Sequence, residues 1–101
     1  MSKKKRDENW QTVKYRLLSD FGDLCWMCHR RFSRAQLTLH HVHQFQATRK
    51  TTYEDSMILC QDCHFNKINK LKYNSKEYWE AMDSIAQGMN NMFDVNIQFK
   101  K

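Results

Sequence analysis

Two stretches decide the fold of this chain: Cys-Trp-Met-Cys at residues 25–28 and Cys-Gln-Asp-Cys at residues 60–63. Together they hold all four cysteines of the 101 residues, as two pairs of the Cys-x-x-Cys form. Each pair can turn two sulfurs toward one metal ion, and two pairs complete the tetrahedral shell of Zn²⁺ with no position left open. We therefore expect one closed, structural zinc site with the ligands Cys25, Cys28, Cys60 and Cys63.

Chain length and charge limit the remaining readings. A domain of this size buries only about two-thirds of its unfolded surface, so a metal staple would add much to its stability. No apolar stretch follows the basic residues 3–6, which favours a reducing cytoplasm, where thiols persist and disulfides do not. The net charge of +6 and the pI near 9.3 indicate an acidic partner such as nucleic acid, or simply a soluble basic surface.

Hydrophobic periodicity predicts the elements around the cysteines. Apolar residues at helical spacing from Trp10 to Phe21, followed by Gly22, predict a helix over 10–21. The alternation that begins at Gln36 predicts a strand up to Val42, and the apolar run 57–59 leads into the second cysteine pair. Helices are also expected from Cys63 to about Leu71 and over 75–92. We expect a basic, flexible arm over 1–9, a single domain over 10–92 and a tail over 93–101.

The last third of the chain carries a separate apolar pattern. Aromatic, methionine and aliphatic residues from Tyr78 to Met92 form one helical stripe, which suits a core or a partner surface. Residues 93–100 alternate apolar and polar side chains, as a strand with one apolar face does. Such a strand needs a sheet edge in its own domain or in a second copy, so a homodimer or a protein partner bound through 75–99 is one expectation.

The ordered motifs resemble a known family. After the first Cys-x-x-Cys pair come Leu-Thr-Leu-His-His-Val at 37–42 and Ile-Leu-Cys-Gln-Asp-Cys-His at 58–64. Over about residues 22–70 this order resembles the HNH (ββα-metal) endonucleases, and the compactness of the chain is similar to that of stand-alone members from bacteriophages and bacteria. The resemblance implies an α+β fold, a small zinc-stapled ββα-metal domain. The periodicity adds flanking N- and C-terminal helices and one possible C-terminal strand.

The resemblance also implies roles for three histidines. His40 and His64 correspond to ligands of a catalytic divalent metal ion, which could be Mg²⁺, Mn²⁺, Ni²⁺ or Zn²⁺. His41 corresponds to the general base. A neutral imidazole can take a proton from water near neutral pH, and a metal held by only two imidazoles keeps positions for water and phosphate oxygens. The implied activity is hydrolysis of DNA, most readily double-stranded DNA, to 5′-phosphate and 3′-hydroxyl ends.

Further residues near these histidines are candidates for supporting roles. Asp55 stands where many family members have an asparagine and is a candidate support of the base. Basic or polar side chains that flank the site suit phosphate contacts in the nucleic acid: His43, Arg49, Lys50, Lys67 and Lys70.

Two substitutions relative to the family pattern keep a second function open. Asp55 accepts hydrogen bonds but lacks the donor that an amide has. Ile68 stands where some members place a further histidine ligand. The alternative hypothesis is therefore a catalytically inactive zinc module that binds nucleic acid or a protein partner.

Overall fold

The computed structural model describes residues 9–44 and 50–100 of the chain. Helices, short helical turns and two strands alternate along these residues, which confirms the predicted α+β class. In chain order the elements are α1 (Trp10–Phe21), η1 (Arg34–Gln36), β1 (Leu37–His41), η2 (Tyr53–Asp55), β2 (Ser56–Cys60), α3 (Gln61–Cys63), η3 (His64–Ile68) and α4 (Lys76–Phe93). Of the predicted basic arm, all but Asn9 lies outside the described residues.

The centre of the fold is an antiparallel hairpin of β1 and β2. Leu37 lies opposite Cys60, and His41 lies opposite Ser56. Alternation along β1 buries Leu37 and Leu39 and turns Thr38 and His40 to the other face. β2 is buried at all five positions, because other parts of the chain cover both of its faces.

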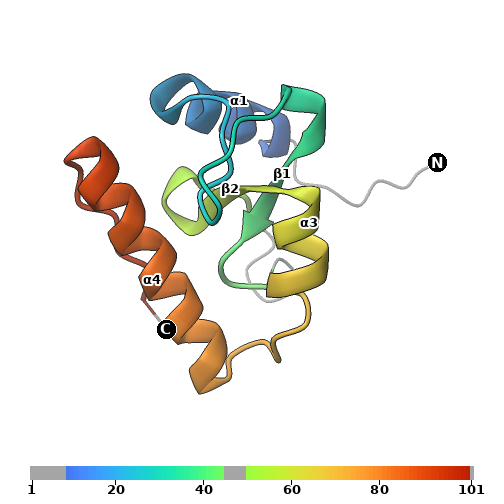
Figure 1. Cartoon of the computed structure of the whole chain (residues 1–101), viewed down its shortest axis with the longest axis vertical. Helices are drawn as coiled ribbons and strands as arrows, with labels where there is room; N and C mark the ends of the chain where they lie inside the picture. The colour runs from blue at the N-terminus through green and yellow to red at the C-terminus, as the bar shows by residue number, and fades with distance from the viewer. Residues whose placement is uncertain (1–8, 45–49, 101) are drawn as a thin grey trace.

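Helix α1 has the bounds that its apolar spacing predicted. Val13, Leu17, Leu18 and Phe21 are buried on one side of it. The helix ends where Gly22 adopts a φ of 93°, a left-handed value that glycine reaches without a Cβ clash, and the Gly22 amide donates to the carbonyl of Leu18 at 2.7 Å. Figure 1 shows α1 and α4 on different sides of the hairpin, so the core lies between them.

Helix α4 begins at a Ser75 cap, where the Ser75 hydroxyl accepts the amide of Tyr78 at 3.1 Å. Its buried face runs from Tyr78 through Met82 to Met89 and joins the main core. The predicted stripe therefore ends one turn early, since Met92 is 46% exposed.

The expectation of a C-terminal strand is wrong. Asp94 adopts a left-handed φ of 55°, which ends α4 and turns the chain back. The Asn90 carboxamide then binds both the amide and the carbonyl of Ile97, at 2.6 and 2.9 Å, as a neighbouring strand would. Within the described ranges the sheet has two strands only. Because Ile97 and Phe99 pack on the core of their own chain, the idea of a partner bound through 75–99 gains no support.

Within residues 9–44 and 50–100, no helix is both long enough and apolar enough to cross a membrane.

Candidate active site and cysteine metal centre

The four cysteines form one cluster. Their sulfurs all lie within 4.8 Å of one another, and Cys25, Cys60 and Cys63 are buried. In a tetrahedral site with Zn–S bonds of about 2.3 Å the sulfurs are about 3.8 Å apart, so the cluster is compatible with a structural zinc ion. The arrangement joins the first cysteine pair to the end of β2 and to α3, and these segments are also linked by the Trp26 amide, which donates to the carbonyl of Ile58 at 2.9 Å.

Both cysteine pairs have amides directed at their first sulfur. The amide of Met27 donates to Cys25 Sγ at 3.3 Å, and the amide of Cys63 donates to Cys60 Sγ at 3.4 Å. His29 closes the first turn with a left-handed φ of 64°, and its amide donates to the carbonyl of Cys25. Amides that point at a sulfur favour the thiolate, which is the form that binds metal.

The thiol pKa values show how the crowded sulfurs affect one another. Burial acts to raise the pKa of Cys25, but the amides that surround its sulfur outweigh burial, so this pKa lies below its usual value. Burial raises the pKa of Cys28 and of Cys63, and the neighbouring thiol of Cys25 adds to the rise in both. A bound cation would favour the thiolate form of these cysteines, and the donor set fits Zn²⁺.

His40 and His64 come from different elements and lie side by side. His40 is on the face of β1 that also carries Thr38, and His64 follows the second cysteine pair at the start of η3. Their ring centroids are 5.2 Å apart, with the rings at 73° to each other. The structure thus places side by side the two histidines that the sequence resemblance names as ligands of one metal ion.

Thr38 fixes the tautomer of His64. The Thr38 hydroxyl donates its single hydrogen to the carbonyl of Leu59 at 2.9 Å and lies 2.7 Å from His64 Nδ1. Because the hydroxyl hydrogen is already used, Nδ1 must carry the proton and donate to Thr38. His64 Nε2 is left with a lone pair, which is the form that a metal ligand needs.

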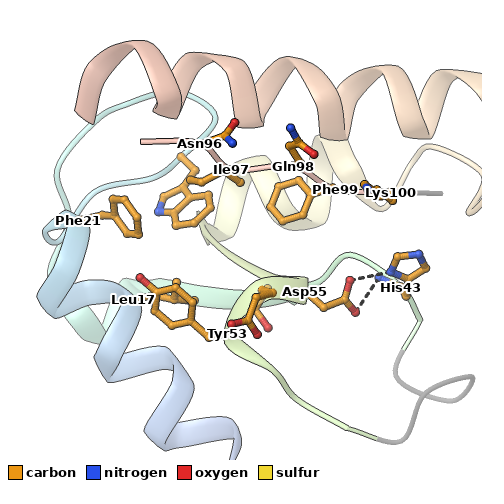
Figure 2. A pocket seen from close by; sticks show the side chains of 13 residues that line it. Leu17, Phe21, His43, Tyr53, Asp55, Asn96, Ile97, Gln98, Phe99 and Lys100 are labelled. Carbon is orange, nitrogen blue, oxygen red and sulfur yellow. Dashed lines mark hydrogen bonds and ion pairs between the residues drawn. The ribbon is translucent and has the colours of Figure 1, made fainter. Parts of the chain in front are cut away.

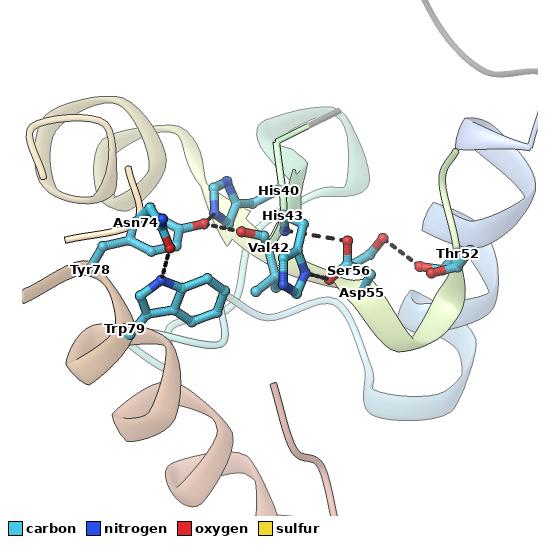
Figure 3. A network of polar contacts seen from close by, with 9 residues as sticks. All are labelled: His40, Val42, His43, Thr52, Asp55, Ser56, Asn74, Tyr78 and Trp79. Carbon is cyan, nitrogen blue, oxygen red and sulfur yellow. Dashed lines mark hydrogen bonds and ion pairs between the residues drawn. The ribbon is translucent and has the colours of Figure 1, made fainter. Parts of the chain in front are cut away.

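Tyr78 of α4 does the same for His40, at the other ring nitrogen. Its hydroxyl donates to the carbonyl of Val42 and lies 2.9 Å from His40 Nε2 (Figure 3). His40 must therefore donate from Nε2, which leaves the lone pair on Nδ1.

Both of these histidines are held neutral. Burial, and then the nearby charges of His64 and His41, lowers the pKa of His40 to about 3. Burial, and then the charge of His41, also lowers the pKa of His64. At neutral pH both rings are therefore unprotonated at one nitrogen and able to bind a cation.

His41 ends β1, next to His40 in the chain. Its Nε2 lies 2.9 Å from the hydroxyl of Thr51, a residue that is almost fully buried. Both His40 and His41 line a pocket of about 320 Å³ that Ile68, Tyr73 and Tyr78 help to enclose. His40 and His41, although adjacent on β1, therefore line the same pocket at the end of the strand.

Asp55 contacts the loop after His41. Its carboxylate accepts from the His43 ring at 2.6 Å and from the His43 amide at 3.3 Å (Figure 3). The backbone carbonyl of Asp55 accepts the amide of Val42 at 2.9 Å. Three hydrogen bonds thus connect Asp55 to Val42 and His43, the two residues that follow His41.

The basic residues proposed for phosphate contacts lie on exposed parts of the chain. Lys67 is in η3, Lys70 follows it, and Lys50 comes just before the buried Thr51; all three lysines are exposed. Arg49 lies outside the described residues.

A larger pocket, of about 500 Å³, lies away from the paired histidines. The tail residues Ile97 and Phe99 line it, together with Phe21 and Trp26 of the core, and His43 and Asp55 reach its rim (Figure 2). The ring nitrogen of Trp26 is buried there without a hydrogen-bond partner among the described residues. His40, His41 and His64 do not line this pocket, so the pocket of greater volume is not the candidate active site.

Thr38, Thr51 and Tyr78 were missed by the sequence reasoning. The strand period could have found Thr38, since it lies two residues before His40 and so shares its face. No local signal links Tyr78 to His40, because 38 positions separate them.

Comparison with known families agrees with this geometry. Residues 25–70 match the family of HNH endonucleases, which confirms the resemblance and indicates a nuclease-type function. No curated protein matches the chain.

Proposed function

We propose that this protein is a metal-dependent HNH endonuclease that hydrolyses phosphodiester bonds of DNA. The observation that supports this most is the pairing of His40 with His64, each neutral and each with one nitrogen lone pair left by its hydrogen bond. Two neutral imidazoles with fixed tautomers, side by side, suit a shared cation.

Two metals have separate roles in this proposal. Cys25, Cys28, Cys60 and Cys63 would hold one structural Zn²⁺, for which their clustered sulfurs are suited. His40 and His64 would hold a divalent cation, whose positive charge would stabilise the phosphate and the leaving 3′ oxygen. Nitrogen ligands suit Zn²⁺, Ni²⁺ or Mn²⁺ better than Mg²⁺, which prefers oxygen ligands, so we expect Mg²⁺ to be the weakest of the four.

His41 acts as the general base that takes a proton from the attacking water. Its place on the pocket shared with His40 and its bond to Thr51, which orients the ring, support this role. Water would attack the phosphorus in line with the 3′ oxygen, leaving 5′-phosphate and 3′-hydroxyl ends. Asp55 is a positioning residue, because it holds Val42 and His43 and thereby the turn that sets His41.

Double-stranded DNA is the proposed substrate. The chain has a net charge of +6, and the exposed Lys50, Lys67 and Lys70 lie near the histidines in the sequence. Together with His43 and Arg49 they would contact phosphates, so binding should weaken steeply as salt rises.

One observation favours the rival function, an inactive zinc module that binds nucleic acid or a protein. Ile68 is buried in the pocket wall, at the place where some family members have a further ligand. Metal affinity at His40 and His64 then depends on two protein ligands only.

The experiment that separates the two functions compares His64→Ala with wild type. We expect wild-type protein to nick supercoiled plasmid in Mn²⁺ or Ni²⁺, and the variant to lose about 10²-fold or more of that rate while keeping one zinc per chain. The matched control is His29→Asn, since His29 is exposed and asparagine tolerates its left-handed φ. Equal nicking by wild type and His64→Ala, or no nicking in any metal, would contradict the nuclease.

Thr38→Val tests the support of His64. Valine has the shape of threonine but cannot accept the Nδ1 proton, so His64 loses its fixed tautomer. We expect affinity for the second divalent ion to fall about 10- to 100-fold, measured by titration calorimetry on zinc-loaded protein. Thr12→Val, at an exposed site on α1, should leave the affinity unchanged. An affinity that Thr38→Val does not change would show that the hydroxyl plays no part in binding.

A further inference from the structure

A pocket with aromatic walls adjoins His64. Its volume is about 330 Å³, and it is lined by Phe65 and His64 of η3 and by Trp10 and Lys14 of α1. Phe65 stacks on the His64 ring, with centroids 4.8 Å apart and an angle of 17° between the rings. Lys14 Nζ lies 5.4 Å from the Trp10 ring, which places a positive charge in the same wall. The pocket therefore combines flat rings with a cation.

The exposure of Phe65 is not explained by folding. Ile68 and Cys63 are the buried residues of this helical segment, so Phe65 is not needed for the core, and 51% of its surface is open. The segment is a π-helical turn, closed by the Asn69 amide on the carbonyl of His64 at 3.0 Å, and such turns are frequent at functional sites. A large aromatic ring that is open to water beside a reactive site suits a ligand with a flat face.

We propose that this aromatic pocket binds an unstacked nucleobase of the nucleic acid, next to the phosphate that His40 and His64 address. The proposal rests on the proposed function, because His64 belongs to both sites. The occupant is argued from charge and continuity: the chain is basic, Lys14 suits the phosphate of the same nucleotide, and the pocket opens directly beside the metal-binding ring.

The same pocket offers little to read a base edge. The Thr38 hydroxyl in its wall already binds Leu59 and His64, and the other lining residues beside the rings and Lys14 are aliphatic. Stacking accepts every base, so the pocket selects an unpaired nucleotide rather than a sequence. In duplex DNA the base must first leave the stack, which costs free energy, so double-stranded DNA with a mismatch or gap beside the cut should be preferred to a perfect duplex.

The test measures binding of two single-stranded 12-mers, one of thymidine and one abasic with the same phosphates, to the zinc-loaded full chain without added divalent metal. We expect Phe65→Ala to weaken thymidine binding about tenfold in fluorescence anisotropy and to leave abasic binding unchanged. Phe65→Trp should restore the preference for thymidine. The matched control is Met92→Ala, which removes a similarly exposed apolar side chain from α4 and should change neither affinity.

Each outcome is decisive for this pocket. A loss with Phe65→Ala that is equal on both strands, no loss on either, or failure of Phe65→Trp to restore binding would overturn the base-binding proposal. Plasmid nicking is measured separately and judges the nuclease. If nicking is absent but the thymidine-selective loss remains, the nuclease fails and the pocket stands; if nicking occurs without that loss, the pocket alone fails.

Discussion

Removing the metal from the four cysteines is expected to unfold the protein. A structural zinc ion contributes about 10 kcal/mol or more to the folding of a small domain, which is comparable to the whole stability of such a domain. Here the cluster ties the first cysteine pair to β2 and α3, and so holds together both sides of the core. Circular dichroism should show loss of the cooperative melt when a strong chelator is added, and its return when Zn²⁺ is added back.

Cys60→Ser should have the same effect without a chelator. Cys60 closes β2, and its sulfur also accepts the amide of Cys63, so serine removes a ligand and leaves that turn weaker. Asp62→Ser, in the exposed middle of the same pair, is the matched control and should bind one zinc and melt as wild type does. A Cys60→Ser protein that melts at the wild-type temperature would show that the staple is not needed.

Replacing His41 with alanine is expected to have the largest effect on activity. Loss of a general base typically costs a factor of about 10² to 10⁴ in rate, and the neighbouring His40 cannot take over, because its Nε2 is committed to Tyr78 and its Nδ1 is proposed to face the cation. Single-turnover plasmid nicking at saturating Mn²⁺ measures this loss. DNA affinity and zinc content should remain at wild-type values.

The control for His41→Ala must separate chemistry from folding. Thermal melts of the variant should stay within a few degrees of wild type, since His41 is at a strand end and only partly buried. If His41→Ala nicks plasmid at the wild-type rate, His41 is not the general base.

Much of the fold could be predicted from periodicity. The apolar spacing gave the bounds of the first helix, and the alternation around Leu37 and Leu39 gave the first strand. The tail could not be predicted in this way, because alternation reports one apolar face and does not say what pairs with the backbone. The Asn90 side chain takes the place of a strand there, and a hydrogen bond between a side chain and a distant backbone has no sequence period.

The candidate site divides in the same manner. Spacing between cysteines fixed the metal cluster, and the resemblance singled out His40 and His64, which the structure places ring to ring. The hydrogen bonds that set their tautomers depend on tertiary contacts. Asp55 illustrates the limit: its position in the pattern suggested support for His41, whereas its carboxylate reaches His43.

The hydrogen bond between Tyr78 and His40 determines how much of the chain must be transferred for the paired histidines to keep their arrangement. Tyr78 lies eight positions past the end of the matched segment, 25–70, yet it fixes one imidazole of the pair. A fragment cut at residue 70, or the motif grafted into another scaffold, would let the His40 ring flip and exchange its tautomers. An engineer who transplants these histidines must therefore bring α4 with them, or supply a hydroxyl in its stead.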